Sequence, residues 1–219
     1  MKQTLIIKFK ITGNLRYLSH RETMSMFQKA VVRAGIDVCY SQGFNPRPAL
    51  SLPLPRSVSV ESDGDILSAV VMVASDATEA QLQACISRQL PVNCRIDSVS
   101  LLLGKTSFQP ISAEYVFPII DLDTDEKVTA AAEHLRSSIA ANEPLFVERT
   151  NPKKRVTTKK DITPLIASVE RRGDDIVVKY NITPAGSVRV DEITKILKID
   201  SSKLASPIRR TSIEWKRKN

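Results

Sequence analysis

Alternating apolar and polar residues open the chain. Between residues 5 and 11, one face would be formed by Leu5, Ile7, Phe9 and Ile11, and this period of two predicts a half-buried strand. Ser19 is followed three residues later by Glu22, a spacing typical of a helix capping box. Apolar residues then recur at helical spacing as far as Gly35, which suits the position after a helix C-terminus. The sequence therefore predicts a strand at 5–11 and a helix that begins at Ser19.

The first half continues with a regular succession of strand and helix patterns. It predicts a short strand at 36–40, a proline-rich edge segment at 49–55, a turn at 62–65, an apolar strand at 66–74, a helix capped by Asp76 and Glu79, and a strand at 95–103. Pro53 and Pro55 restrict their segment to an edge or irregular strand. The order strand, helix, strand, strand, helix, strand is that of a ferredoxin-like βαββαβ domain.

Residues 104–110 are polar and rich in turn formers, and they predict a linker between domains. The same order of patterns then recurs: a strand at 113–120, a helix capped at 123–126, a strand at 144–148, a basic strand or loop at 155–160, a hairpin at 165–182, a helix at 190–197 and a strand at 209–215. The halves share this pattern without visible sequence identity. We therefore predict an α+β fold of two tandem ferredoxin-like domains with antiparallel sheets, at 1–106 and 111–219.

Amino-acid composition limits the partners and the cellular location that can be expected for this chain. The chain has 219 residues and a formal net charge of +8, which favours an anionic partner such as nucleic acid. No apolar run approaches the 18 or more residues of a membrane span, and the amino-terminal residues lack the apolar core of a signal peptide. Three scattered cysteines, Cys39, Cys85 and Cys94, fit a reducing compartment and argue against a disulfide framework, a zinc site or an iron–sulfur cluster. We expect a cytoplasmic protein that does not bind membranes.

The segment that follows the short strand at 36–40 has an unusual composition. Two prolines stiffen it, and Gly43 permits a turn that other residues resist. A stiff loop with exposed aromatic, amide and arginine side chains favours a recognition surface, while a hairpin corner with two buried aromatics is the alternative. The candidate binding residues of this segment are Tyr40, Ser41, Gln42, Gly43, Phe44, Asn45 and Arg47.

Basic residues gather at two places in the second half. The denser run contains Arg149, Lys153, Lys154, Arg155, Lys159 and Lys160. A second cluster, between Arg209 and Lys218, lies near the C-terminus. Basic runs attract phosphates without sequence preference, and a solvated hairpin is the alternative for the denser run. We take Lys153, Lys154, Arg155, Lys159 and Lys160 as candidate RNA contacts.

Two segments of the first half carry a resemblance to a known family. The segment Ile-Thr-Gly-x-Leu-Arg-Tyr-Leu-Ser-His at 11–20 and the segment Tyr-Ser-Gln-Gly-Phe-Asn-Pro-x-Pro at 40–48 resemble the radical SAM-linked proteins, a bacterial family of unknown function. Lys-Asp-Ile-x-Pro at 160–164 is similar to a second recurrent segment of that family. Members are usually encoded beside, or fused behind, a radical SAM protein with a cobalamin-binding-type domain. The resemblance implies a radical SAM partner for this chain.

The chain departs from the family at two positions. Arg47 stands where many members have a histidine, and Arg21 stands where an aliphatic residue is common. Both differences favour contact with phosphate over imidazole chemistry. Ser57-Val58-Ser59 also replaces a more apolar, glycine-containing segment, which puts a strict family mechanism in doubt.

Few residues could perform chemistry. His20 lies in the first turn of a predicted helix, close in sequence to Arg16; it could bind a phosphate with help from the helix N-terminus or act as a general acid or base. The only other histidine is His134. The sequence has no Cys-x3-Cys-x2-Cys motif, no phosphate-binding glycine loop and no metal-ligand spacing. We therefore expect no catalytic residue, metal or cofactor in this chain, and any radical chemistry would belong to a partner.

The sequence leads to one preferred function and two alternatives. We expect a non-catalytic, RNA-binding accessory protein of a radical SAM enzyme that modifies tRNA or ribosomal RNA, without DNA specificity. Arg16, His20 and residues 40–48 are expected to converge into one binding site. The first alternative is a metal-independent endoribonuclease that uses His20 with Arg16 and Arg47. The second is a protein–protein adaptor that binds the radical SAM partner and no RNA.

Overall fold

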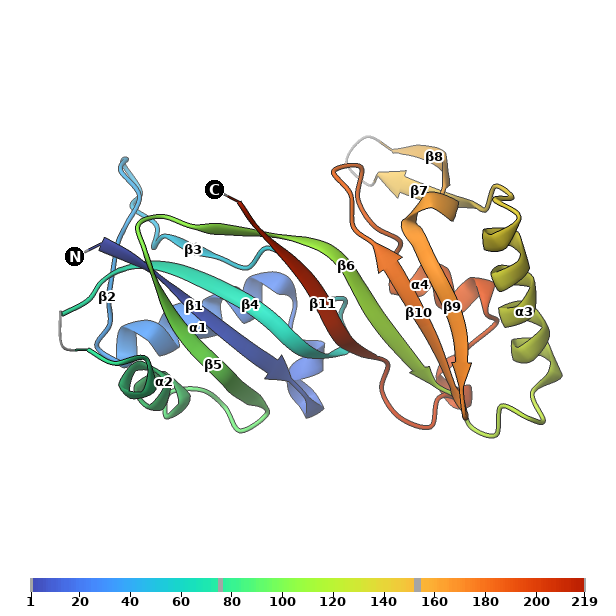
Figure 1. Ribbon diagram of the computed structural model, residues 1–219, viewed down its shortest axis with the longest axis horizontal. Helices are drawn as coiled ribbons and strands as arrows, with labels where there is room; N and C mark the ends of the chain where they lie inside the picture. The colour runs from blue at the N-terminus through green and yellow to red at the C-terminus, as the bar shows by residue number, and fades with distance from the viewer. Residues whose placement is uncertain (1, 75–76, 152–154, 219) are drawn as a thin grey trace. The chain divides into compact units, whose positions relative to one another are not determined.

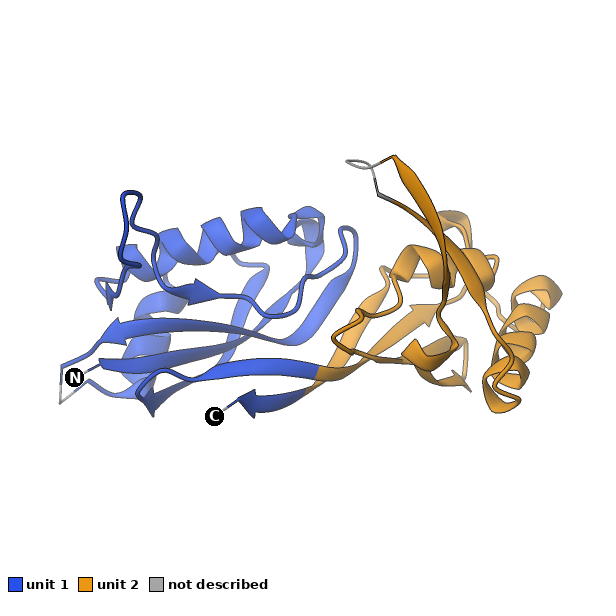
Figure 2. Ribbon diagram, turned by 90° about the horizontal axis from the view of Figure 1, so that it is seen from above, with its two compact units in different colours: residues 1–110, 215–219 blue, residues 111–214 orange. Residues whose placement is uncertain are grey.

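The computed structural model describes residues 2–74, 77–151 and 155–218 and shows an α+β fold with a mostly antiparallel sheet (Figure 1). Four α-helices occur in these residues, and none is long and apolar enough to cross a membrane. The chain divides into two compact units (Figure 2): unit 1 comprises residues 1–110 and 215–219, and unit 2 comprises residues 111–214. The domain limits drawn from sequence stay a prediction; the compact units differ from them in grouping the last five residues with unit 1.

Unit 1 is built around a central strand. Its elements in chain order are β1 (Lys2–Ile11), the 3-10 turn η1 (Gly13–Tyr17), α1 (His20–Arg33), β2 (Asp37–Val38), β3 (Leu50–Ser51), β4 (Glu61–Met72), α2 (Glu79–Ser87) and β5 (Cys94–Leu103). β1 pairs antiparallel with β5 on one side and with β4 on the other. The short strands β2 and β3 pair antiparallel with β4 as well. The strands therefore lie in the order β5, β1, β4 and then β2 with β3.

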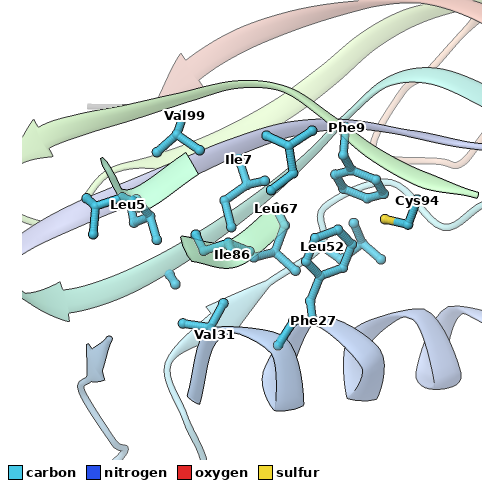
Figure 3. Packing of buried hydrophobic residues seen from close by; sticks show 14 of the residues in the cluster. Leu5, Ile7, Phe9, Phe27, Val31, Leu52, Leu67, Ile86, Cys94 and Val99 are labelled. Carbon is cyan, nitrogen blue, oxygen red and sulfur yellow. The ribbon is translucent and has the colours of Figure 1, made fainter. Parts of the chain in front are cut away.

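The core of unit 1 lies between α1, α2 and one face of this sheet (Figure 3). The alternating positions of β1 place Leu5, Ile7 and Phe9 on that face, and all three are fully buried. Phe27 of α1 packs against Phe9 with ring centroids 4.4 Å apart. Burial of side chains of this size stabilises the fold by about 1.5–3 kcal/mol each. The alternation in the sequence thus decides which face of the sheet receives the helices.

Unit 2 repeats this order of elements with an added hairpin. It contains most of β6 (Ser107–Pro118), then α3 (Glu126–Ala140), β7 (Phe146–Asn151), β8 (Val156–Asp161), η2 (Thr163–Leu165), β9 (Ile166–Arg172), β10 (Asp175–Asn181), α4 (Val190–Ile196), η3 (Ser201–Lys203) and the first part of β11 (Arg209–Lys218). The strand order is β11, β6, β10, β9, and β7 pairs with β8 in a separate two-stranded sheet. Tyr115 of β6 stacks on Tyr180 of β10 in the core, at 4.3 Å between ring centroids.

The first predicted strand and helix are confirmed at atomic detail. β1 contains the predicted alternating segment, and Ser19 caps α1. The side chain of Ser19 accepts the backbone N–H of Glu22, while the Glu22 carboxylate accepts the backbone N–H of Ser19. This reciprocal capping satisfies donors at the helix N-terminus that would otherwise have no partner.

The turn predicted at 62–65 is wrong, because β4 runs through it. Gly64 has φ +76°, and the register with β1 shifts between Phe9 and Ile11 at this point. Ser62 donates a hydrogen bond to the Asp65 carboxylate at 2.8 Å inside the bulge. Turn-forming residues therefore make a β-bulge that bends the strand without ending it.

Other boundaries shift for similar reasons. The predicted linker at 104–110 is wrong in its second half, because β6 begins at Ser107. The capping box of α2 is made by Thr78 and Gln81, while Asp76 lies outside the described residues. α3 is capped by Asp125. Each region offers several cap-forming residues in succession, and the sequence pattern does not choose among them.

Two glycines with the same backbone geometry allow a test of how tightly η1 is held. Gly13 has φ +57° and Gly35 has φ +73°. A Cβ atom at Gly13 would lie 2.5 Å from Nδ2 of Asn93, whereas a Cβ at Gly35 would meet no atom within 4 Å. We expect Gly35→Ala to lower the free energy of unfolding by about 1 kcal/mol, the cost of a left-handed conformation. Gly13→Ala should cost about 2–3 kcal/mol because overpacking adds to that cost.

Urea denaturation of the two variants measures this difference. Adding Asn93→Ala to Gly13→Ala should recover part of the loss, because it removes the clashing side chain. Equal destabilisation by the two single substitutions would show that the Asn93 side chain does not restrict η1.

Candidate functional site

A buried arginine organises the turn that precedes α1. Arg56 is only 8% exposed, and its guanidinium donates to five backbone carbonyls. Nη1 lies 2.6 Å from the carbonyl oxygens of Arg16 and Val60 and 3.4 Å from that of Ser57. Nη2 lies 3.1 Å from those of Leu15 and Leu18. A guanidinium carries five N–H donors in a planar arrangement, so it can satisfy several carbonyls at once. Arg56 therefore fixes the path of η1.

A carboxylate holds the other end of the same turn. Glu61, also buried, accepts the backbone N–H of Gly13 at 2.8 Å. The side chain of Arg16 folds back onto the turn, donating to the carbonyl of Gly13 at 2.9 Å and to the hydroxyl of Tyr17 at 2.7 Å. Its guanidinium carbon lies 4.4 Å from the centroid of the Tyr17 ring. Some of the N–H donors of Arg16 are therefore used in hydrogen bonds within η1.

The surroundings of His20 do not favour the phosphate site expected there. The Glu22 carboxylate accepts both the backbone N–H and the hydroxyl of Ser19, at 2.8 and 2.7 Å. The hydrogen bonds from Ser19 lower the pKa of Glu22, so a negative charge already occupies the start of α1. Nδ1 of His20 is buried and makes no hydrogen bond with the described residues. In the part of the chain that the structure describes, Nδ1 of His20 therefore has no hydrogen-bonded group with which to exchange a proton.

The segment 40–48, hereafter loop 40–48, projects from the edge of unit 1 between β2 and β3 (Figures 1 and 2). Cys39 and Ala49 anchor its base through backbone hydrogen bonds with Val70 of β4. Within the loop, Ser41 donates its N–H to the carbonyl of Arg47 at 2.8 Å, and the Ser41 hydroxyl accepts the N–H of Arg47 at 2.9 Å. Residues 40–47 are all exposed. The loop is therefore closed at its base and open to solvent at its tip.

Loop 40–48 and His20 lie at opposite ends of β4, so the expected convergence does not occur in the structure. η1 is bound to Glu61 at the start of β4, and the base of the loop is bound to Val70 near its end. These residues are nine positions apart in one strand, which corresponds to about 30 Å. Both regions follow β1 in sequence, but α1 carries the chain back along the sheet between them.

The basic run of the second half forms a hairpin whose two faces differ. Arg149 of β7 makes a bidentate ion pair with Glu192 of α4, at 2.7 and 2.8 Å, and donates to the carbonyl of Ser187 at 2.9 Å. The hydrogen bonds of Glu192 raise the pKa of Arg149. Burial opposes ionisation of Glu192, but the hydrogen bonds from Arg149 and from the N–H of Arg189 outweigh it and lower the pKa of Glu192. Arg149 stabilises unit 2 from the inner face of the hairpin.

The remaining basic candidates differ in their exposure. Lys160 shares the inner face and donates to the carbonyl of Ala185 at 2.6 Å. Lys159 and Arg155 are exposed, so their charges can reach an anion. Lys153 and Lys154 lie outside the described residues.

The C-terminal basic cluster is not a continuous basic surface. Arg210 is fully buried and donates to the hydroxyl of Tyr115 at 3.3 Å. Arg217, in unit 1, donates to the hydroxyl of Thr106 at 3.3 Å. Arg209 is exposed, and it interacts with other residues of the chain. Alternation along β11 thus sends neighbouring arginines into different environments.

Cys94 is not an activated nucleophile. All three are free thiols, and Cys94 is buried in the core of unit 1. Burial, followed by the nearby Asp65 carboxylate, raises the pKa of Cys94 to about 12, so this thiol stays protonated at neutral pH. Among the described residues, no group of three or more His, Cys, Asp or Glu side chains could hold a metal ion.

Arg56 and Glu61, which hold the two ends of η1, were not predicted from the sequence. A signal existed for Arg56, since it is the single basic residue between Arg47 and Arg88 and is preceded by an apolar, proline-rich segment. A charged residue in such a setting indicates an internal partner. Glu61 carried no comparable signal, because it adjoins the polar segment Ser62–Asp65.

The role of Arg56 can be tested by a substitution that keeps the charge. Lysine cannot place donors at five carbonyls in different directions, so Arg56→Lys should lower the free energy of unfolding by about 2–3 kcal/mol. The exposed Arg47→Lys is the matched control and should leave stability unchanged. Chemical denaturation measures both, and wild-type stability in Arg56→Lys would show that η1 does not depend on the guanidinium.

The Arg149–Glu192 pair predicts a dependence on pH. Arg149→Met should cost about 3 kcal/mol at pH 7, because it leaves a largely buried carboxylate without its ion-pair partner. The pKa of Glu192 is lowered in the folded state from 4.5, so the pair contributes fully above that value. Its contribution is lost as the pH falls through the lower, folded-state pKa. Stability curves of wild type and Arg149→Met should converge in acid, while the exposed control Lys159→Met should match wild type throughout; a constant gap would contradict the assignment.

Comparison with known proteins places the chain in a family. Residues 4–198 match the model of a family described as an uncharacterized protein conserved in bacteria, DUF2344. No curated protein matches. A crystal structure of an unknown protein from Galdieria sulphuraria is 12% identical, with 90% of this chain and 91% of that chain covered, but its TM-score of 0.22 supports no argument. Because the family model spans most of the sequence, this chain belongs to the uncharacterized bacterial family DUF2344.

Proposed function

We propose that this protein is a non-catalytic RNA-binding accessory protein, with loop 40–48 as its main contact surface. The observation that carries the proposal is the exposure of two aromatic side chains beside an arginine on one stiff loop. Tyr40 is 51% exposed and Phe44 is 107% exposed, and Arg47 is exposed beside them. Aromatic side chains that stack on bases, together with cations that contact phosphates, are the usual means of binding single-stranded nucleic acid.

Local charge supports an anionic ligand at this loop. No acidic residue occurs between Asp37 and Glu61. An anion that approaches Arg47 therefore meets no acidic side chain from its own segment. The exposed Lys159 and Arg155 of unit 2 are candidates for further phosphate contacts. Lys160 and Arg16 are weaker candidates, because their donors already bind the chain's own carbonyls or hydroxyls.

The proposal also includes a protein partner and a fold family. A radical SAM enzyme that modifies tRNA or ribosomal RNA is the proposed partner, on the basis of the resemblance of residues 11–20 and 40–48 to radical SAM-linked proteins. Each unit is proposed to be ferredoxin-like. The strand orders β5-β1-β4-β2/β3 and β11-β6-β10-β9 support this, since both place the first strand beside the third and the last.

The proposal favours binding over cleavage. A nuclease that uses His20 with Arg47 would need both residues at one scissile phosphate, and they lie at opposite ends of β4. A cleavage assay with the wild type and His20→Ala tests this alternative. RNA cleavage that disappears in His20→Ala would contradict a non-catalytic role.

Filter binding to bulk tRNA and ribosomal RNA over a range of salt tests the main proposal. We expect binding that weakens with salt, and Arg47→Gln should reduce the slope of log affinity against log salt by about 0.7, the contribution of one phosphate contact in single-stranded RNA. Lys29→Gln, an exposed charge on α1, is the matched control. Absence of RNA binding at moderate salt would refute the proposal; capture of the radical SAM protein, weakened by Arg47→Gln, would then identify an adaptor.

A further inference from the structure

We infer that Phe44 stacks on an unpaired nucleobase, so that the RNA bound by loop 40–48 is single-stranded or looped at the point of contact. This inference rests on the proposed function and names the class of RNA that the loop would recognise. The ring of Phe44 does not pack against the rest of the fold. Phe44 is 107% exposed, while another exposed phenylalanine, Phe146 of unit 2, is 61% exposed. A phenylalanine that makes no contact with the core gains its burial only in a complex.

The loop presents Phe44 in a restricted conformation. Reciprocal hydrogen bonds join Ser41 and Arg47 on the two sides of the tip, and Tyr40 forms an isolated β-bridge with Pro48. Pro46 fixes φ two residues after Phe44, and Gly43 immediately before it has φ +148°, which other residues rarely adopt. Because the loop is already ordered by its own contacts, binding would cost less conformational entropy than ordering a free segment.

The residues around Phe44 favour a base over an apolar protein surface. Its neighbours in sequence are Gln42, Gly43 and Asn45, and none of them adds an apolar side chain of the kind that enriches the buried core of protein interfaces. Side-chain amides instead can donate to and accept from the edges of a base that stacks on the ring. Arg47 lies on the same loop and can contact the adjoining phosphate.

An aromatic ring at the tip of a loop can distinguish unpaired RNA from double-stranded RNA. In a duplex both faces of each internal base are covered by its neighbours, and the deep major groove of A-form RNA is closed to side chains. An unpaired base has a free face that can cover Phe44. Stacking of this kind is tolerant of sequence, so the loop would select unpaired RNA without reading a particular base.

The experiment compares two forms of one RNA. The probe is a short single-stranded RNA that carries 2-aminopurine, used alone and annealed to its complement. We expect wild type to bind the single strand more tightly than the duplex and to quench 2-aminopurine fluorescence. Phe44→Leu should weaken single-strand binding about tenfold, the loss of one base–aromatic stack, and abolish the quenching. Phe44→Trp should retain both.

Two controls show whether weaker RNA binding reflects the loss of stacking. The first tests whether the substitution destabilises the protein, and the second tests whether the loss of any exposed phenylalanine has the same effect. Phe44→Leu should leave the thermal unfolding of the protein unchanged, because the ring contacts no core residue. Phe146→Leu removes an exposed phenylalanine of unit 2 and should bind the single strand as wild type does.

The remaining outcomes overturn the inference, and they differ in whether the proposed function survives. Wild-type affinity and quenching in Phe44→Leu, with RNA binding intact, would refute stacking and leave the proposed function standing. Equal affinity for the duplex and the single strand would have the same meaning. Failure to bind either RNA would refute both, and a loss of binding to the radical SAM protein in Phe44→Leu would then assign the ring to a protein interface.

Discussion

The arrangement of unit 1 depends on the buried guanidinium of Arg56. Five backbone carbonyls, from residues 15–18 and from the segment before β4, converge on it, and Glu61 binds the first N–H of η1. Removing a cation from water is costly, and hydrogen bonds to its donors must offset that cost. Because carbonyls of η1 and of the segment before β4 share one partner, the end of β1, the start of α1 and the start of β4 are held at one end of the sheet.

This constraint also separates the two regions that looked functional in the sequence. α1 begins shortly after η1 and runs back along the sheet, so loop 40–48 emerges far from His20 although only nineteen residues lie between them in sequence. Residues 11–20 have a structural role. A glycine is needed at position 13 because φ is positive there and Asn93 leaves no room for a Cβ atom. Ser19 is needed to cap α1. Residues 40–48 make no such contribution to the core. This difference supports the proposal that loop 40–48 is the binding surface.

Local sequence patterns predicted the helices and strands, whereas contacts between residues distant in sequence determine which side chains are free to bind a ligand. The alternation of β1 and the Ser19–Glu22 spacing each lie within one element, so the sequence displays them directly. The bulge at Gly64 looked like a turn because the residues that favour both are the same. The ion pair of Arg149 with Glu192 joins residues that are distant in sequence, and no local pattern reveals that this arginine has an internal partner.

The number of basic residues consequently overstates the surface available to an anion. The chain has 32 Lys and Arg residues, yet Arg56 and Arg210 are buried and Arg149 is paired with Glu192. A phosphate responds to the charges within about 10 Å that remain exposed, and it is repelled by neighbouring carboxylates. Loop 40–48 carries a single arginine, but no acidic residue of its own segment opposes it. The proposal of loop 40–48 as a binding surface therefore rests on its local balance of charge and on the exposed Phe44, and not on the density of basic residues in the sequence.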